Sequence, residues 1–114
     1  MKIYNRTRQT VLADRGRLAD TPLSRLKGLL GRDHLDSDEG LVITQCRSIH
    51  MLFMRFAIDV VFIDGEGKVI GLVKDIKPYR ISGYYWRAWA AVELPAGTIQ
   101  QTSTQKGDLI SWTV

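Results

Sequence analysis

Short runs of β-branched and other apolar residues alternate with glycine, proline and charged residues along the whole chain. The strongest runs cover residues 58–63 and 68–73, which flank the sequence Asp64-Gly65-Glu66-Gly67. Glycine adopts positive φ angles without steric cost, so this arrangement predicts a β-hairpin. Weaker runs of the same kind predict further strands at Lys2 to Asn5, Gln9 to Ala13, Leu41 to Thr44, Ala88 to Leu94 and Leu109 to Thr113.

One helix is predicted directly after Thr21. The hydroxyl of Thr21 suits the N-cap, and Pro22 suits the first helical position. A backbone N–H at that position makes no hydrogen bond within the helix, so proline, which has none, is tolerated there. Gly31 is expected to end this helix. Its predicted apolar face consists of Leu23, Leu26 and Leu30.

The pattern as a whole predicts a mostly β (α+β) fold, a small, partly closed antiparallel β-barrel-like domain with one short capping helix. The 114 residues suffice for a single domain, 1–114, and show neither a repeat nor a linker. The composition is 45% hydrophobic and 25% charged, which is typical of globular proteins and argues against disorder.

The sequence lacks paired cysteines and long apolar segments, which excludes several classes of protein. Cys46 is the sole cysteine, so an internal disulfide framework is excluded. The first residues contain no apolar signal region, and no stretch approaches the roughly 20 apolar residues of a membrane span. We therefore expect a cytoplasmic protein that does not enter a membrane.

The formal charge of +4 is concentrated near the N-terminus. Residues 1–32 carry eight Lys and Arg against two Asp, a net charge of +6, and the remaining residues carry eight against ten, a net charge of −2. Clustered cations can bind phosphates, but only Tyr4 is available among them to stack on a base. We interpret the basic segment as a solvated surface and do not expect nucleic acid as a partner.

The segment from Cys46 to Asp59 holds most of the side chains that could carry chemistry. A Cys/His pair suggests either a nucleophile with its base or two metal ligands. If the segment is extended, Cys46 and His50 lie about 13 Å apart, whereas one helical turn would bring them together. The candidate ligand-binding residues are Cys46, Arg47, His50, Met54, Asp59 and, from a later strand, Glu93.

Each candidate also has an ordinary structural interpretation. Cys46 and Met54 fit a core or a pocket wall, and His50 fits a core or rim position. Asp59 is expected to form an ion pair with Arg47 or Arg55. Glu93 interrupts an apolar run, so it must find a partner or be protonated, and a salt bridge to an arginine is expected.

These residues also carry a family resemblance. The chain resembles the DUF192 family, also called UPF0127, which consists of small bacterial and archaeal proteins of uncharacterised function. The resemblance implies a compact β-rich, barrel-like domain with a short helix, and it implies no activity, cofactor or catalytic residue. It is carried by Arg25-x-x-Gly28-Leu29-Leu30-x-Arg32, Glu39-Gly40-Leu41, the segment from Cys46 to Asp64, Val92-Glu93-Leu94-Pro95-Ala96-Gly97 and Gly107-Asp108.

Three functions are open on this basis. The favoured hypothesis is a non-catalytic binding domain whose polar pocket takes an unknown small molecule, namely a small anion or a sugar. Tyrosine and tryptophan from the Tyr79 to Trp89 region are expected at the rim of this pocket. An enzyme of hydrolase or lyase type would use His50 as acid or base with Glu93 or Asp59. An accessory module would bind a protein partner through Tyr84-Tyr85-Trp86 or the basic segment. We expect no cofactor and no structural zinc, because nitrogen and sulfur ligands are too few.

Overall fold

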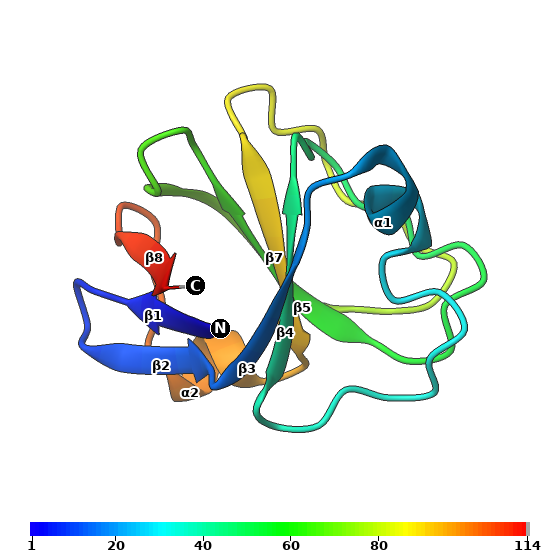
Figure 1. Cartoon of the computed structure of the whole chain (residues 1–114), viewed down its shortest axis with the longest axis horizontal. Coiled ribbons are helices and arrows are strands. Elements are labelled where there is room, and N and C mark those ends of the chain that lie inside the picture. The colour runs from blue at the N-terminus through cyan, green and yellow to red at the C-terminus, as the bar shows by residue number, and fades with distance from the viewer. Residues whose placement is uncertain (114) are drawn as a thin grey trace.

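Two β-sheets form the framework, and neither closes on itself (Figure 1). The computed structural model describes residues 1–113. The smaller sheet has the order β2-β1-β8 and is antiparallel throughout. Its strands are β1 (Lys2–Asn5), β2 (Thr10–Ala13) and β8 (Ile110–Thr113).

The larger sheet has five strands in the order β3-β4-β7-β5-β6, with β7 at its centre. All neighbours are antiparallel except β3 and β4, which run parallel because a helix and a loop connect them. The prediction of a mostly β fold is confirmed. The parallel pair departs from the predicted antiparallel design, and the two separate sheets do not close into the predicted barrel-like form. The strands are β3 (Arg15–Ala19), β4 (Glu39–Thr44), β5 (Ile58–Ile63), β6 (Val69–Ile76) and β7 (Ala90–Pro95).

The hairpin of β5 and β6 forms where the sequence predicts it. The carboxylate of Asp64 accepts hydrogen bonds from the backbone N–H groups of Glu66 and Lys68, which closes the turn. Gly67 adopts a φ of 88°, and a Cβ there would lie 2.6 Å from the carbonyl oxygen of Ile110. This position therefore requires glycine for both its backbone angle and its space.

Each face of the five-stranded sheet has its own apolar core. One face packs against the three-stranded sheet and contributes side chains such as Val61 and Val92. The other face, which includes Val60 and Ala91, is covered by loops and by the residues around Leu29. Successive side chains of a strand point to opposite faces, so neighbouring residues of β5 and β7 belong to different cores.

Helix α1 (Pro22–Lys27) begins as predicted. Thr21 accepts a hydrogen bond from the N–H of Ser24, and the hydroxyl of Ser24 accepts one from the N–H of Thr21, which forms a capping box. The predicted end was wrong, because Gly28 caps the helix with a φ of 48°. The predicted apolar face was wrong for Leu23 and Leu26, which are 77% and 75% exposed, whereas Leu30, beyond the end of the helix, packs against one of the two cores.

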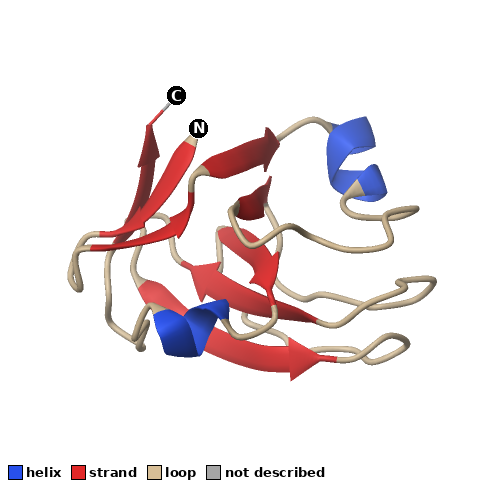
Figure 2. Ribbon diagram, turned by 90° about the horizontal axis from the view of Figure 1, so that it is seen from below, coloured by secondary structure: helices blue, strands red, loops and turns tan. Residues whose placement is uncertain are grey.

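A second helix, α2 (Thr98–Gln101), was not predicted, and it lies on the side of the molecule opposite α1 (Figure 2). It packs beside β5 through the buried Ile99. In the described part of the chain, neither helix has the length or the apolar character to cross a bilayer.

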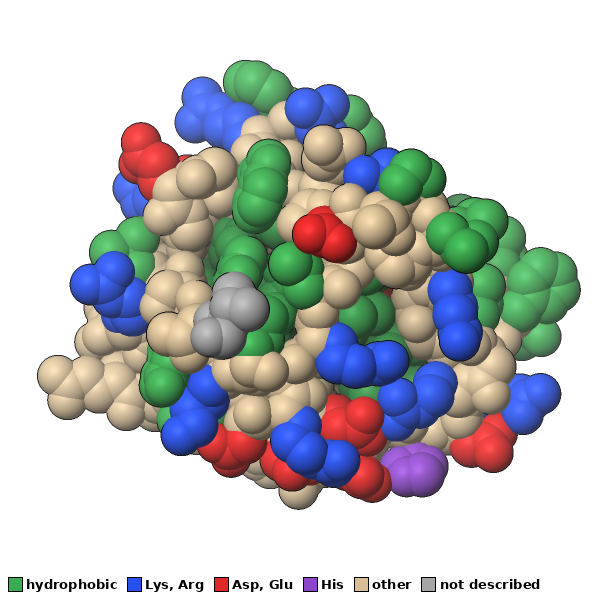
Figure 3. Space-filling view, in the orientation of Figure 1, with side chains coloured by type: hydrophobic (Ala, Val, Ile, Leu, Met, Phe, Trp, Pro, Cys, Tyr) green, Lys and Arg blue, Asp and Glu red, His purple; other side chains and the backbone are tan. Residues whose placement is uncertain are grey.

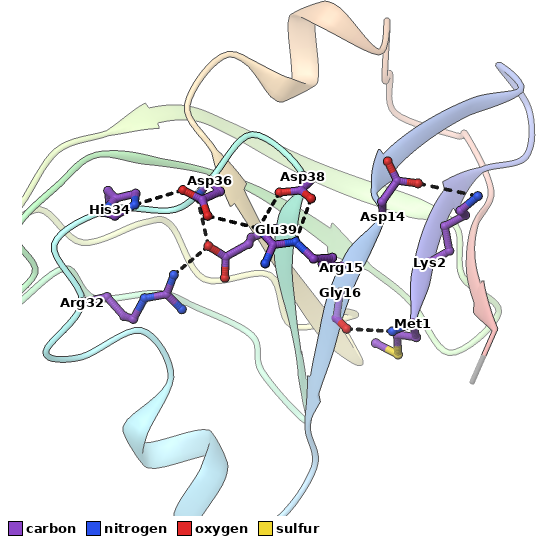
Figure 4. A network of polar contacts seen from close by, with 10 residues as sticks. All are labelled: Met1, Lys2, Asp14, Arg15, Gly16, Arg32, His34, Asp36, Asp38 and Glu39. Carbon is purple, nitrogen blue, oxygen red and sulfur yellow. Dashed lines mark hydrogen bonds and ion pairs between the residues drawn. The ribbon is translucent and has the colours of Figure 1, made fainter.

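Several cations of the basic N-terminal segment are held in ion pairs (Figure 4). Arg15 binds Asp38 at 2.7 Å and Asp36 at 3.0 Å, and Arg32 binds Glu39 at 2.7 Å. These hydrogen bonds hold the pKa of Asp38 and that of Glu39 below the usual range. Basic and acidic side chains consequently lie intermixed along one edge of the molecule (Figure 3).

Candidate functional site

A small pocket lies between α1 and the segment that follows β4, above one face of the five-stranded sheet. Its volume is about 130 Å³. The wall on the helix side comes from residues 25–30, and the opposite wall comes from the segment that the sequence analysis singled out. The lining residues from that segment and from the sheet are Ile43, Cys46, Ser48, Ile49, His50, Met51, Met54 and Glu93.

Glu93 forms the floor of this pocket. It belongs to the central strand β7, where Leu41 of β4 and Val60 of β5 flank it in register. The side chain is 5% exposed, and among residues 1–113 no side chain or backbone group hydrogen-bonds or ion-pairs with its carboxyl group. Burial raises the pKa of Glu93 to about 7. The expected salt bridge between Glu93 and an arginine is therefore absent from the described structure. The raised pKa fits the other expectation, that the carboxyl group of Glu93 is protonated.

Cys46 lies in the wall as a half-buried thiol. Its Sγ donates a hydrogen bond to the carbonyl oxygen of Ser48 at 3.3 Å. Burial, together with the negative charge of Glu93, raises the pKa of Cys46 to about 11. A thiol with such a pKa is protonated at neutral pH, so it is a poor nucleophile.

The backbone from Cys46 to His50 does not form a helical turn, and His50 instead pairs with Ile81 in an antiparallel bridge. Cys46 and His50 nevertheless both line the pocket, whose other walls come from α1 and the sheet. Among residues 1–113, no cluster of three or more His, Cys, Asp or Glu side chains is arranged to hold a metal ion.

Asp59 lies away from the pocket, on the opposite face of the sheet. It pairs with Leu94, whereas the next residue of β5, Val60, pairs with Glu93. Its carboxylate accepts hydrogen bonds from the N–H groups of Asp75 at 2.8 Å, Gly97 at 3.1 Å and Ile99 at 2.9 Å. Asp59 thus fastens the start of α2 to β5, and it cannot orient His50.

The expected ion pair of Asp59 with an arginine is not formed. Arg55 binds Asp33 instead, at 2.7 Å. Arg47 is exposed and lies outside the Glu93 pocket. Of the six candidate residues, the structure brings Cys46, His50, Met54 and Glu93 together around one pocket and leaves Arg47 and Asp59 outside it.

Arg47 lines a second, wider hollow next to the first. Its volume is about 570 Å³, and Cys46 and Ser48 belong to the walls of both hollows. The remaining walls come from the aromatic segment that precedes β7. The residues of this second hollow are Gln45, Cys46, Arg47, Ser48, Tyr84, Ala88 and Trp89.

Tyr85 anchors the aromatic segment to the sheet. Its ring stacks on Phe62 with 4.3 Å between centroids, and it covers Gly71 so closely that a Cβ there would collide with the ring. With Tyr85 turned inward, Tyr84 and Trp86 point outward, and each is 66% exposed. Of the three aromatic residues expected at the surface, these two are the most exposed, and Tyr85 is partly buried.

Several residues of the site were not among the candidates. Leu29 follows the end of α1 and packs into the pocket wall, and Gln45 lines the second hollow. Tyr84 and Trp89, which also line the second hollow, belong to the Tyr79 to Trp89 region that was expected at the rim. The spacing of the leucines pointed instead to Leu23, Leu26 and Leu30, of which Leu26 and Leu30 also line the Glu93 pocket. The signal that could have found Leu29 is the sequence Gly28-Leu29-Leu30, because a positive φ at the glycine ends the helix and redirects the chain.

Comparisons with known proteins agree on a family and on a fold. The model of the DUF192 family, described as uncharacterized ACR, matches residues 3–112. A UPF0127 protein of Thermococcus sibiricus is 32% identical over 98% of this chain and 75% of its own length. Another, from Thermococcus kodakarensis, is 34% identical over 97% of this chain and 73% of its own length.

The fold has a counterpart among solved structures. The crystal structure of a protein of unknown function from Novosphingobium aromaticivorans is similar, with a TM-score of 0.83 and 20% sequence identity. The similarity covers 97% of this chain and 82% of that one. At this identity the comparison shows a shared fold.

Proposed function

The chain belongs to the DUF192 family of uncharacterised proteins, and within that family we propose that it is a non-catalytic binding domain for a small sugar or related polyol. The ligand occupies the pocket above β7, where a hydroxyl group donates a hydrogen bond to Glu93. The apolar walls cover the carbon skeleton of the ligand.

The observation that carries this proposal is the carboxyl group of Glu93, which is buried and has no partner in the described chain. No fully enclosed side-chain oxygen of the described chain lacks a hydrogen bond, so the oxygens of Glu93 retain contact with the space inside the pocket. A carboxyl group that is otherwise shielded from water gains from a hydrogen-bond donor placed in that space. The group lines a pocket that opens to the surface, so a ligand can reach it. A ligand that binds here gains a hydrogen bond that the protein alone does not make.

The acidic floor favours a neutral hydroxyl over a small anion, the other ligand class expected from the sequence. An anion at the floor would meet the charge of Glu93 in a poorly solvated place. Arg47, the arginine expected to bind an anion, lies outside the pocket. Two other cations line the pocket, but Arg25 is hydrogen-bonded to Gln45 at 2.9 Å and Lys27 is exposed, so neither lies at the floor beside Glu93. A hydroxyl group can donate to a carboxylate and also accept from a carboxylic acid, so it suits a group whose pKa is about 7.

The test compares ligands and variants in one assay. Thermal-shift and calorimetric titrations use glucose, xylose, glycerol and myo-inositol, with sulfate, phosphate and acetate as the anions. We expect at least one neutral compound to bind, and Glu93→Gln to weaken it about tenfold or more, because a hydrogen bond to a charged group is lost. Glu66→Gln in the exposed hairpin is the matched control and should bind normally.

Two results would refute the proposal. The first is that no neutral sugar or polyol binds, or that the anions alone bind. The second is that Glu93→Gln and Glu66→Gln bind the same compound equally well, because Glu93 would then have no part in recognition.

One observation supports an enzyme as the second candidate. His50 and Glu93 line the same pocket, and a carboxyl group with a pKa of about 7 is suited to exchange protons near neutral pH. If the chain is a hydrolase or lyase, NMR of a bound sugar derivative will show product that accumulates with time and stops with His50→Ala. A ligand that stays unchanged through prolonged incubation supports binding alone.

A further inference from the structure

We infer that the Glu93 pocket is the closed end of a longer groove and that its ligand is the terminal unit of a neutral carbohydrate chain, whose following units lie along Tyr84 and Trp89. The inference rests on the proposed function and specifies its ligand class.

The continuity of three hollows is the first observation. Cys46 and Ser48 belong to the walls of both the Glu93 pocket and the second hollow. Tyr84 belongs to the walls of both the second hollow and a third one of about 360 Å³. The third hollow is lined by Ile70, Tyr84, Tyr85, Trp86 and Arg87. The three hollows therefore adjoin one another in sequence, from Glu93 past Cys46 and Tyr84 to Ile70 of β6.

The side chains along this path suit sugar rings. Tyr84 is 66% exposed and Trp89 is 43% exposed, so both offer aromatic surface to a ligand. An aromatic ring combines a large apolar face with little conformational freedom, which suits it to pack against the C–H face of a pyranose. The side chains of Gln45, Arg47 and Ser48 line the same hollow as the two rings and can bind hydroxyl groups.

The groove is held in shape before any ligand arrives. The segment that carries Arg47 and the segment that carries Tyr84 are joined by backbone hydrogen bonds, including Tyr85 N–H to the carbonyl of Arg47 at 2.8 Å and Ser82 N–H to the carbonyl of Ile49 at 2.8 Å. Tyr85 fixes the second segment to Phe62. A preformed groove loses little entropy when it binds, so the aromatic contacts can contribute to affinity.

The charged side chains of the groove are distributed unevenly. Among the described residues, Glu93 is the only acid in the walls of the three hollows, and the cations are Arg25 and Lys27 in the Glu93 pocket and Arg47 and Arg87 in the two outer hollows. Arg25 is hydrogen-bonded to Gln45 at 2.9 Å, and Lys27 is exposed, so the group at the floor of the closed end is Glu93, which favours a neutral terminal unit. Arg87 lies over the ring of Trp86 at 4.9 Å, which leaves Tyr84 and Trp89 as the stacking surfaces. Single-stranded nucleic acid also stacks on aromatic rings, but its terminal phosphate would meet the acid at the closed end.

The experiment measures how affinity depends on chain length. Calorimetric titrations compare glucose with maltohexaose and cellohexaose, and xylose with xylohexaose, for the wild-type chain. We expect at least one hexasaccharide to bind about tenfold or more tightly than its monosaccharide. Tyr84→Ala and Trp89→Ala should each remove most of this gain and leave the monosaccharide affinity within about twofold.

Tyr79→Ala is the matched control, because Tyr79 is also 66% exposed but lines none of the three hollows. It should keep the full gain with chain length. Circular dichroism and thermal unfolding of every variant show whether it is folded. Tyr84→Phe, which keeps the ring, should retain the gain if Tyr84 acts by stacking.

The outcomes separate this inference from the proposed function. If a monosaccharide binds and no hexasaccharide binds more tightly, the groove is not part of the site and only the inference fails. If no sugar binds at all, both fail. If an oligothymidylate binds through Tyr84 and Trp89 more tightly than every oligosaccharide, the groove is a nucleic-acid surface and the inference is overturned.

Discussion

Glu93 makes the stability of the fold depend on pH in a way that a single substitution can reveal. Burial raises its pKa from 4.5 to about 7. The folded state therefore holds this proton more tightly than the unfolded chain does. The resulting stabilisation is fully present below pH 4.5 and falls as the pH rises to about 7. Above that pH it is lost.

The size of the effect follows from the same linkage. A pKa that rises from 4.5 to about 7 on folding corresponds to roughly 3 kcal/mol of unfolding free energy. Glu93→Gln keeps the shape of the side chain and remains neutral at every pH. Relative to this variant, the wild-type chain should lose roughly 3 kcal/mol of stability between about pH 4.5 and about pH 8.

Urea unfolding, followed by tryptophan fluorescence at intervals across this range, measures the difference directly. The amide introduced by Glu93→Gln contributes a constant offset, so the informative quantity is the change of the difference with pH. Glu66→Gln, on the exposed hairpin, controls for the loss of a carboxyl group elsewhere. A difference between wild type and Glu93→Gln that stays constant over the whole range would refute the reasoning, because Glu93 would then be well solvated.

Three further predictions concern the framework and the thiol. Gly71→Ala should destabilise the fold by roughly 1–3 kcal/mol in urea unfolding, because the new Cβ would collide with the Tyr85 ring. Gly65→Ala, with open space around it, should change the unfolding free energy by less than about 0.5 kcal/mol. Equal effects of the two substitutions would contradict this packing. Asp59→Ala leaves three backbone N–H groups without their acceptor and should cost more than about 3 kcal/mol by the same assay, so a near-normal stability would be inconsistent with its role. Burial raises the pKa of Cys46 from 9.0 to about 11. At about pH 8 its thiol should therefore react with a disulfide reagent about 100-fold more slowly in the folded chain than in urea. Equal rates would show that the thiol is not buried.

The elements that were predicted correctly are those specified by local sequence. The hairpin of β5 and β6 depends on the residues that flank Gly65 and Gly67, and the start of α1 depends on Thr21 and Pro22. Both signals act within a few residues, so they hold in almost any tertiary context. The strands at each end of the chain were also placed within one residue of their bounds.

The elements that were missed depend on distant contacts. The parallel pairing of β3 with β4 joins strands on either side of α1, and no local pattern indicates it. Helix α2 is tied at its start by Asp59, which lies 40 residues away from Ile99 in the chain. Leu23 and Leu26 have helical spacing, yet both side chains are exposed and neither belongs to one of the two cores.

The amino-acid sequence by itself determined that this protein is mostly β, where its hairpin and helix begin, and that Cys46, His50 and Glu93 are candidates for a common site. Only the tertiary structure decided which acid serves the pocket. Asp59 and Glu93 lie on adjacent central strands, and their side chains reach opposite faces because the register pairs Glu93 with Val60. A shift of one residue would exchange the two faces, and that register is set by contacts across the whole sheet, which no local stretch of sequence contains.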